Sequence, residues 1–355
     1  MRSKVYLGHL SDFHIGQVMY GNRVHSSDRW PFCYLQSDNC HDDVLVLRLA
    51  DVWSGPDRVH RRLRVPVDTP IPIAVTGDLT RRGADAEFRL AKSYIEGRWT
   101  PPDGFVRGPG LRQGSSGSDL SVPGNHDQWA GSAYWNFPAA FNPFLYRKWF
   151  GSELGAPVLL QSDDGTLVVE VHSIDSNSGH LGRMFRPMQG GSISEEAIRR
   201  LRDRLAHSHS PKDENSAKVA KRVRIILCHH SFSNLFAAPA PLDEPSLGNL
   251  LETAAEYGIS VVLTGHTHYT DWKEYTSSTG ASTWEIRASS ALAAPSAPST
   301  NEPNPQGNPP EICAHGFWVH EIERVGHDKA VWRSHMFQWD GETFKNYPPV
   351  EIAVF

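Results

Sequence analysis

The feature that most constrains this chain is a repeated pattern in which a short β-branched run ends abruptly in glycine, an acid, an amide or histidine. These runs occupy residues 4–7, 71–75, 168–171, 223–227 and 259–263. Runs of this length are typical of buried strands. Two stretches between them have helical spacing of apolar residues: one begins after the cap residue Ser194, and the other stops at Gly258. Strands that alternate with helices predict an α/β fold.

Three further segments are irregular in composition. Residues 106–119 are rich in glycine and serine, residues 207–221 are polar, and residues 289–310 contain six prolines. None of them divides the chain, so we expect one domain over residues 1–355, with insertions at about 15–70 and 106–119 and a proline-rich loop at about 289–311. Alternating residues at 316–322 and 330–332 predict antiparallel strands that complete a second sheet.

Composition argues against several classes of protein. No apolar run in the 355 residues approaches the ~18–20 residues of a bilayer-spanning helix, and the first residues lack the apolar core of a signal peptide. A balance of 35 Lys and Arg against 40 Asp and Glu disfavours a general nucleic-acid binder. Four cysteines without C-x-x-C spacing fit a reducing compartment, so we expect a cytoplasmic protein: Cys33, Cys40, Cys228 and Cys313.

Five segments that follow predicted strands collect side chains able to bind metal ions. They are residues 11–14, 76–78, 123–127, 228–230 and 265–268. The carboxyl ends of strands in open α/β sheets face a shared crevice, which is where ligands bind. Asp12 and His14 are two residues apart, as are His266 and His268, so in an extended turn each pair can point the same way.

The ligand types predict which ions such a crevice holds. Imidazole, carboxylate and amide oxygen suit first-row divalent ions such as Mn, Fe, Zn or Co. The set is too large for one tetrahedral ion and suits two, with a shared carboxylate holding them ~3.5–4 Å apart. Each fragment alone also fits an ordinary turn or a hydrogen-bonded histidine; the ordered set predicts a dinuclear site. Its members are Asp12, His14, Asp78, Asn125, His229, His266 and His268.

The ordered motifs Asp12-x-His14, Gly77-Asp78, 124–127 (Gly-Asn-His-Asp), His229 and 265–268 (Gly-His-x-His) resemble those of the calcineurin-like metallophosphoesterase superfamily. The resemblance spans residues 12–268 and so covers most of the chain. Within the superfamily it is closest to the cyclic-nucleotide and glycerophosphodiester phosphodiesterase branch, on the His229-His230 pair, the stretch 173–177 and the overall length. It implies a four-layer αββα sandwich, in which two mixed β-sheets are flanked by helices.

The resemblance also implies a role for each motif residue. A hydroxide between the two metals attacks phosphorus, and His126 stabilises the developing charge or protonates the leaving oxygen while Asp127 orients its ring. His230 is expected at the rim of the site or behind its ligands. The metal ligands implied are Asp12, His14 and His268 for the first ion, Asn125, His229 and His266 for the second, and Asp78 as the bridge.

The chain departs from the family pattern at one position. The family usually has a second acid or amide three residues after the aspartate of Gly-Asp, whereas Arg81 stands there in this chain. Arg81 and Arg82 either face a substrate phosphate or are solvated residues at the start of a helix. The spacer before Gly77, with Trp30 and Trp53, either covers the site or is a surface insertion.

The expected function is that of a dinuclear metal-dependent phosphoric-ester hydrolase, a phosphodiesterase of small diesters such as cyclic nucleotides or glycerophosphodiesters. A phosphomonoesterase is an alternative because the same core serves both ester types. A nuclease would need a DNA-binding extension, and no basic stretch supplies one. A non-catalytic scaffold is the alternative from a different class; a degenerate member would have lost some ligands. No membrane partner is expected, and a homo-oligomer is an open alternative.

Overall fold

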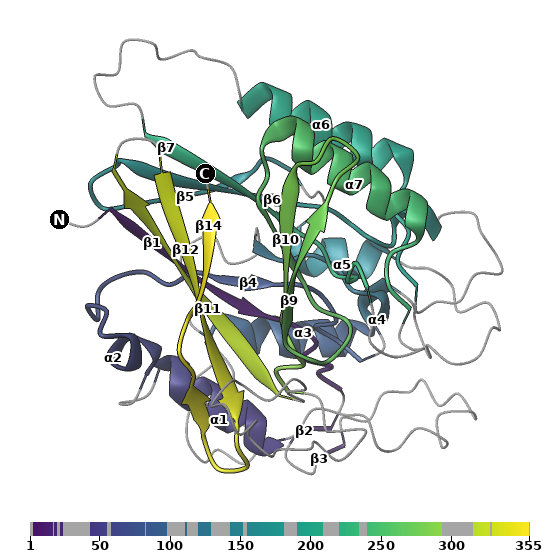
Figure 1. Ribbon diagram of the computed structural model, residues 1–355. Helices are drawn as coiled ribbons and strands as arrows, with labels where there is room; N and C mark the ends of the chain where they lie inside the picture. Colours follow the sequence, from purple (N-terminus) through teal and green to yellow (C-terminus); the bar gives the residue numbers. More distant parts are fainter. Residues whose placement is uncertain are drawn as a thin grey trace, which may run out of the picture.

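The computed structural model describes residues 3–16, 18–19, 22–23, 43–54, 58–81, 83–97, 111, 120–128, 143–151, 155–180, 190–208, 220–233, 240–292, 315–326 and 329–354. Within these ranges, two mixed β-sheets pack face to face, and helices cover the outer face of each (Figure 1). The predicted αββα sandwich is therefore confirmed.

The first sheet brings together the two ends of the chain. Its strand order is β13 (Phe344–Asn346), β12 (Lys329–Trp339), β11 (Gly316–Val325), β1 (Lys4–Leu10) and β4 (Ile73–Val75), and β14 (Val350–Val354) pairs with β12. Strand β1 runs antiparallel to β11 and parallel to β4, with His9 opposite Ala74. The predicted C-terminal strands are thus present, and the sheet that they complete is the one that contains β1.

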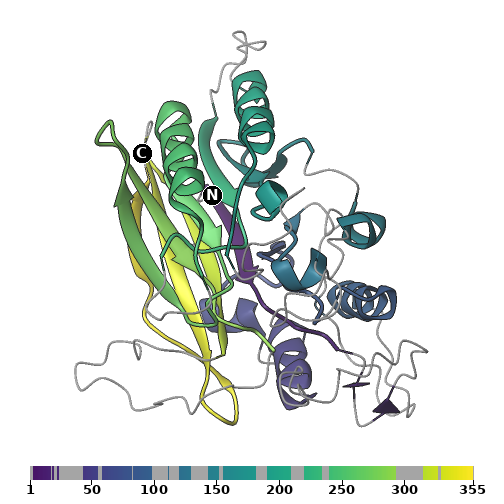
Figure 2. The ribbon, with the colours of Figure 1, turned by 90° about the vertical axis from the view of Figure 1, so that its right-hand side faces the viewer.

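The second sheet has the order β5 (Val158–Gln161), β6 (Leu167–Ser173), β7 (Lys221–Leu227), β8 (Val261–Thr264), β10 (Ser282–Arg287) and β9 (Asp271–Thr276). Strands β6, β7, β8 and β10 are parallel, and β5 and β9 are antiparallel edge strands. A separate pair is formed by β2 (Val18–Met19) and β3 (Asn22–Arg23). Figure 2 shows the long C-terminal strands beside the strands of the second sheet.

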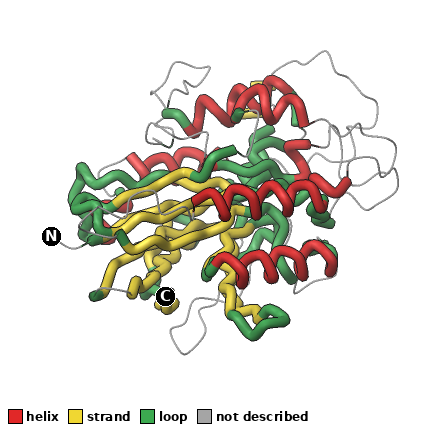
Figure 3. The backbone as a smooth tube through the Cα atoms, turned by 90° about the horizontal axis from the view of Figure 1, so that it is seen from above, coloured by secondary structure: helices red, strands yellow, loops and turns green. Residues whose placement is uncertain are grey.

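Helices form the two outer layers. One layer contains α1 (Asp43–Ser54), α2 (Val59–Leu63), α3 (Asp85–Ile95) and α5 (Pro143–Phe150), whose apolar residues join the core behind β1 and β4. The other contains α6 (Glu195–Ser208) and α7 (Glu244–Tyr257), which pack on β7 and β8. The short elements are α4 (Asn125–Gln128) and η3 (Ser178–His180). Seen from above, the strands form one block with helices beside it (Figure 3).

Alternation along the strands explains the layers. In β1, Val5 and Leu7 face the core between the sheets, whereas Tyr6 and Leu10 face the helices. In β8, Val261 and Leu263 likewise point between the sheets and Val262 toward α6 and α7. A strand buried on both faces reads as a continuous apolar run, which is why these strands were predictable from sequence.

Local signals also place the helices where they were predicted. The Ser194 hydroxyl accepts the backbone N–H of Ala197 at 3.1 Å, which caps α6. Gly258 ends α7 with φ +64°, a left-handed conformation that glycine adopts without strain. None of the described helices combines the length and the apolar character needed to cross a bilayer. Cys228 is a buried free thiol, and the other three cysteines lie outside the described residues.

The segments predicted to be irregular are only partly described. Of residues 106–119 the described one is Leu111, which is buried, and residues 293–314 of the proline-rich segment lie outside the described ranges. In the spacer at 15–70, Trp30 lies outside them, but Trp53 does not. The Trp53 ring is buried in α1 against Phe317 at 5.6 Å between ring centroids, so this part of the spacer belongs to the helical layer over the first sheet.

Candidate metal centre

Four parallel strands, two from each sheet, end at one place, and backbone hydrogen bonds join the loops that follow them. Asp12 N–H donates to the Gly77 carbonyl at 3.0 Å, and His14 N–H donates to the Asp78 carbonyl at 2.9 Å. In the second sheet, Gly265 N–H donates to the His229 carbonyl at 2.9 Å. The loops after β1, β4, β7 and β8 therefore form one framework, as predicted from the strand ends.

The backbone at this framework is conformationally unusual. Six non-glycine residues in the described part of the chain have positive φ, and one of them, Arg64, ends helix α2. The other five are all predicted metal ligands: Asp12, His14, Asp78, His266 and His268. Left-handed backbone is costly for residues with a side chain and clusters at functional sites. This conformation turns each side chain out of its strand direction and into the space between the loops.

Glycines allow the loops to approach closely. A Cβ atom on Gly265 would lie 1.8 Å from the Ser11 hydroxyl oxygen and 2.8 Å from the Oδ2 atom of Asp12. A Cβ atom on Gly124 would lie 2.0 Å from the Oδ1 atom of Asp78. Both motif glycines are therefore required by the contact between one ligand loop and the next.

The first group of ligands converges from β1 and β8. The Nε2 atoms of His14 and His268 lie 3.1 Å apart, and Asp12 Oδ1 lies 3.7 Å from the former and 3.3 Å from the latter. Asp12 Oδ2 accepts the backbone N–H of His266 at 2.9 Å, whereas Oδ1 is buried and accepts no hydrogen bond from the described residues. A buried carboxylate oxygen without a donor is expected where a cation binds.

The second group lies on the opposite side of Asp78. His229 Nε2 is 3.1 Å from Asn125 Oδ1 and 3.2 Å from His266 Nδ1. The outer nitrogens of both rings are held by backbone: His229 Nδ1 lies 2.6 Å from the Thr76 carbonyl oxygen, and His266 Nε2 lies 3.1 Å from that of Ala240. A proton on each outer nitrogen leaves the inner lone pairs free to bind a metal.

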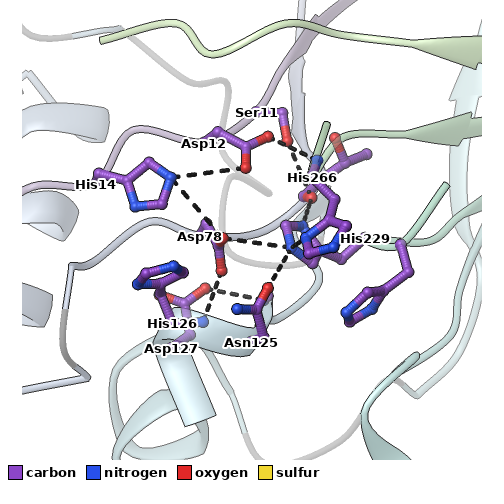
Figure 4. A network of polar contacts seen from close by, with 12 residues as sticks. Ser11, Asp12, His14, Asp78, Asn125, His126, Asp127, His229 and His266 are labelled. Carbon is purple, nitrogen blue, oxygen red and sulfur yellow. Dashed lines mark hydrogen bonds and ion pairs between the residues drawn. The ribbon is translucent and has the colours of Figure 1, made fainter. Parts of the chain in front are cut away.

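Asp78 lies between the two groups. Its Oδ2 atom is 3.9 Å from His14 Nε2 and 3.4 Å from His229 Nε2, and its Oδ1 atom accepts the backbone N–H of His126 at 2.8 Å. Figure 4 shows the dashed contacts from Asp78 to His14 on one side and to His229 on the other. One carboxylate oxygen therefore faces both groups, which is the arrangement expected of a bridging ligand.

Burial and charge set the protonation of these groups. Burial opposes the ionised carboxylate, but the surrounding histidines outweigh it and hold the pKa values of Asp12 and Asp78 well below normal. Burial lowers the pKa of His14 to about 4 and that of His266 to about 3, so both rings are neutral at pH 7. Burial alone would lower the pKa of His229, but the charge of Asp78 outweighs it and raises that pKa to about 9.

The donor set fits metal ions. Within the described residues, groups of histidine and carboxylate atoms within 4.8 Å of one another include Asp12–His14–His268 and Asp12–Asp78–His229. Both groups combine imidazole nitrogen with carboxylate oxygen, which suits first-row divalent ions. The Oδ1 atom of Asp12 is a buried acceptor without a hydrogen bond from the described residues, which favours positive charge beside it.

The residues predicted for catalysis are both at the site, but Asp127 has a different role from the one expected. His126 Nδ1 lies 2.8 Å from the backbone carbonyl oxygen of Arg81, so that carbonyl, and not Asp127, orients the ring. Asp127 accepts hydrogen bonds from the backbone N–H groups of Leu79, Thr80 and Gly124 at 2.9–3.2 Å. Through these hydrogen bonds, Asp127 holds the loop after β4 against the loop that contains His126.

His230 and Arg81 were left open by the sequence. His230 is fully buried behind the ligands, where its Nδ1 atom lies 2.7 Å from the Ser176 hydroxyl and its ring lies 4.3 Å from that of His266. It is therefore not a rim residue. Arg81 contributes its backbone carbonyl to the site, and Arg82 lies outside the described residues.

Several residues that hold the site have no signal in the sequence. The Thr76 and Arg81 contacts use backbone carbonyl groups, which every residue type has. Ser290, at the start of the proline-rich segment, donates its hydroxyl to the Asp12 carbonyl at 2.8 Å. Only the burial of a polar residue beside a ligand loop identifies such contacts, and burial is not visible in the sequence.

Comparison with known proteins agrees with this geometry. The sequence model of the calcineurin-like phosphoesterase family matches residues 6–270. A comparison with curated proteins returned no match. Among solved structures, the chain is similar to GAP50, the anchor in the inner membrane complex of Plasmodium, with a TM-score of 0.53, 11% identity and coverage of 100% of this chain and 90% of that one. At such low identity the similarity concerns the fold.

Two enzyme structures resemble the chain more distantly. A dimetal phosphatase from Danio rerio has a TM-score of 0.46 and 14% identity, with 99% of each chain covered. The calcineurin-like phosphoesterase YfkN from Bacillus subtilis has a TM-score of 0.37 and 13% identity, with coverage of 100% of this chain and 91% of that one.

Proposed function

The chain belongs to the calcineurin-like phosphoesterase family, and we propose that it is a dinuclear metal-dependent phosphoric-ester hydrolase that acts on small phosphodiesters. The observation that carries this proposal is the convergence of imidazole and carboxylate atoms on both sides of Asp78. At the centre of the first group, Asp12 Oδ1 is buried, accepts no hydrogen bond from the described residues and faces the Nε2 atoms of His14 and His268.

The proposed ligand sets follow the two groups. One ion is held by Asp12, His14 and His268, and the other by Asn125, His229 and His266, with Asp78 shared between them. The chemistry that such ions supply is Lewis-acid activation of water and of the phosphoryl oxygens. Manganese, iron, zinc and cobalt all suit this donor set.

His126 is the proposed acid that assists the leaving group. With Nδ1 donating to the Arg81 carbonyl, the ring has a fixed tautomer and Nε2 is the atom available for proton transfer. The His126 ring lies 4.6 Å from that of His14 between centroids, edge to face, so it borders the first group of ligands. When the ring is doubly protonated, the Nε2 proton can pass to the oxygen that leaves phosphorus, and the Nδ1 proton stays on the bond to the Arg81 carbonyl.

The preference for diesters is supported by two sequence features that meet in the structure. The His229-His230 pair and the segment 173–177 are the features on which the resemblance to the phosphodiesterase branch rests, and Ser176 contacts His230 at 2.7 Å. This contact places the segment 173–177 next to His230, behind the second group of ligands. On this basis we propose cyclic nucleotides or glycerophosphodiesters as substrates, in a cytoplasmic setting that the sparse cysteines favour.

Hydrolysis of model esters tests the proposal. Protein loaded with Mn²⁺ is assayed with bis(p-nitrophenyl) phosphate and with p-nitrophenyl phosphate, beside a chelator-treated control and the His126→Ala variant. Cleavage of the diester that the chelator abolishes and that exceeds cleavage of the monoester is the expected result. A preference for the monoester moves the assignment to a phosphatase with the same site.

DNA substrates and a measurement of bound metal address the remaining alternatives. Cleavage of single- or double-stranded DNA in preference to the small diester would identify a nuclease. Failure to bind any metal, with no hydrolysis of either ester, would overturn the proposal and favour a scaffold. GAP50 of Plasmodium, to which the chain is similar in fold, is an anchor in an inner membrane complex and illustrates a role of that kind.

A further inference from the structure

Strand β10 carries two opposite charges on one face of the second sheet. Ile286 points into the core between the sheets, so Glu285 and Arg287 point to the opposite face. Their exposed fractions are 0% and 1%, and Arg287 Nη2 donates to Glu285 Oε2 at 2.8 Å. Burying two charges is costly, and this cost is offset when the pair makes further hydrogen bonds.

Glu285 uses its other oxygen to join two ligand loops. Its Oε1 atom accepts the backbone N–H of Phe232 and the hydroxyl of Thr264, each at 2.8 Å. Phe232 lies in the loop that begins with His229, and Thr264 ends β8 two residues before His266. One carboxylate oxygen therefore fixes the spacing between the two loops of the second ligand group.

Arg287 holds the loop on the other side of His266. Its Nη1 group hydrogen-bonds to the hydroxyl of Tyr269, and its guanidinium carbon lies 4.9 Å from the centre of the Tyr269 ring. Tyr269 is buried and directly follows His268 in the chain. The pair therefore contacts the chain on both sides of the segment from His266 to His268, and it also contacts the loop that follows His229.

We propose that the Glu285–Arg287 pair is a positioning element of the metal centre, which sets the relative placement of His229, His266 and His268. The inference rests on the proposed function, since these histidines are the proposed ligands. It adds to that function because both residues lie beyond the span 6–270 that matches the family model. Neither residue contacts an ion or substrate itself.

Each residue of the pair makes several hydrogen bonds at once, and a single substitution breaks at least one of them. Arg287 bonds to Glu285 and Tyr269 at the same time through two nitrogens of its planar group, and lysine has only one nitrogen for both. The Glu285 carboxylate likewise serves Arg287, Phe232 and Thr264 together. Loss of one contact lets a ligand loop shift, and displaced supporting contacts typically weaken metal affinity by ~10–100-fold.

An ion pair between the buried Glu170 and the partly buried Arg224 on the same sheet provides a control. Arg224 Nε donates to Glu170 Oε2 at 2.9 Å, on β7 and β6, and its Nη1 group donates to the carbonyl of Tyr257 at the end of α7. Variants Arg287→Lys, Glu285→Gln and Tyr269→Phe are compared with Arg224→Lys and Glu170→Gln. Each full-length protein is stripped of metal, its unfolding temperature is measured, and it is titrated with Mn²⁺ for the dissociation constant and with Co²⁺ for the visible absorption spectrum.

The expected result is a dissociation constant raised about tenfold or more in the Arg287 and Glu285 variants, with a changed Co²⁺ spectrum. The control variants lose stability but keep the affinity and the spectrum of the parent. Unchanged affinity and spectrum in folded Arg287→Lys would overturn the inference. If the charge variants do not fold, Tyr269→Phe, which removes only one hydroxyl, is measured in the same way, and unchanged affinity and spectrum in this variant would overturn the inference. Should the parent bind fewer than two ions, the proposed function itself fails, which this design distinguishes.

Discussion

Asp127 and Thr80 are joined by two hydrogen bonds, although they stand 47 positions apart in the sequence. The Oδ1 atom of Asp127 accepts both the backbone N–H and the hydroxyl of Thr80 at 2.9 Å. Since Thr80 follows Asp78 and Asp127 follows His126, this contact sets the distance between the proposed bridging carboxylate and the ring proposed for catalysis.

Replacing Asp127 by alanine should therefore destabilise the protein without freeing the His126 ring. The substitution leaves the N–H groups of Leu79, Thr80 and Gly124 without their acceptor, and each buried unpaired donor costs about 1–3 kcal/mol. We expect chemical denaturation of the metal-free protein to show a loss of several kcal/mol in unfolding free energy. A variant as stable as the parent would contradict the fastening role.

His126→Ala should keep the metals and lose turnover. Its ring borders the ligands and is held through the Arg81 carbonyl, so its removal leaves the contacts among the described ligands in place. Loss of a general acid typically costs ~10²–10⁴-fold in rate. Metal content by elemental analysis and kcat for bis(p-nitrophenyl) phosphate are measured together. Unchanged kcat would remove His126 from the reaction.

Asp78→Ala should abolish binding of at least one ion, because its Oδ2 atom faces both ligand groups. The substitution removes the acceptor of the His126 backbone N–H, which costs about 1–3 kcal/mol, and we expect the fold to persist at this cost. Metal content per chain is compared with that of the His126→Ala variant, which serves as the control. Full occupancy by two ions would refute the bridging role.

Metal binding should release at least one proton at pH 7, from His229, and His268 adds to it because burial is outweighed by Asp12, which raises the pKa of that ring as well. The pKa of His229 in the metal-free protein is raised to about 9, so its ring is protonated at neutral pH and must lose that proton to bind a cation. His14 and His266, with pKa values of about 4 and 3, are already neutral and release none. Apparent affinity should therefore rise about tenfold or more per pH unit from 7 toward 9. Calorimetry in buffers of different ionisation enthalpy measures the proton, and identical heats would contradict it.

Acid should destabilise the sandwich through His9, which lies on β1 in the core between the sheets. Burial lowers the pKa of His9 to about 3, so the folded protein keeps the ring neutral. Below pH 6.5 the unfolded chain binds a proton that the folded chain does not, and stability falls toward pH 3. The slope is roughly 1.4 kcal/mol per pH unit for one such group. His9→Gln, which can still bond the Thr76 hydroxyl, should lose that part of the slope. An identical slope would contradict this.

The strand ends were predictable because the signal is local. Each run such as 259–263 contains both the apolar pattern of a strand and the residue that ends it, so the sequence places His266 and His268 beside the other motifs. The role of Asp127 was not predictable, since its partners are backbone groups of residues 79 and 80. The packing of Trp53 over β1 and the pairing of Glu285 with Arg287 depend on tertiary contacts that no periodicity encodes.

The left-handed backbone at Asp12, His14, Asp78, His266 and His268 has a consequence for relatives of this chain. Each such residue costs ~1–3 kcal/mol relative to glycine in the same conformation. Glycine at His14 or His268 in a relative would remove this strain together with the metal-binding ring, whereas glycine at Asp12 or Asp78 would also leave the backbone N–H of His266 or His126 without its acceptor. Relief of backbone strain therefore favours loss of these histidines before loss of the two carboxylates.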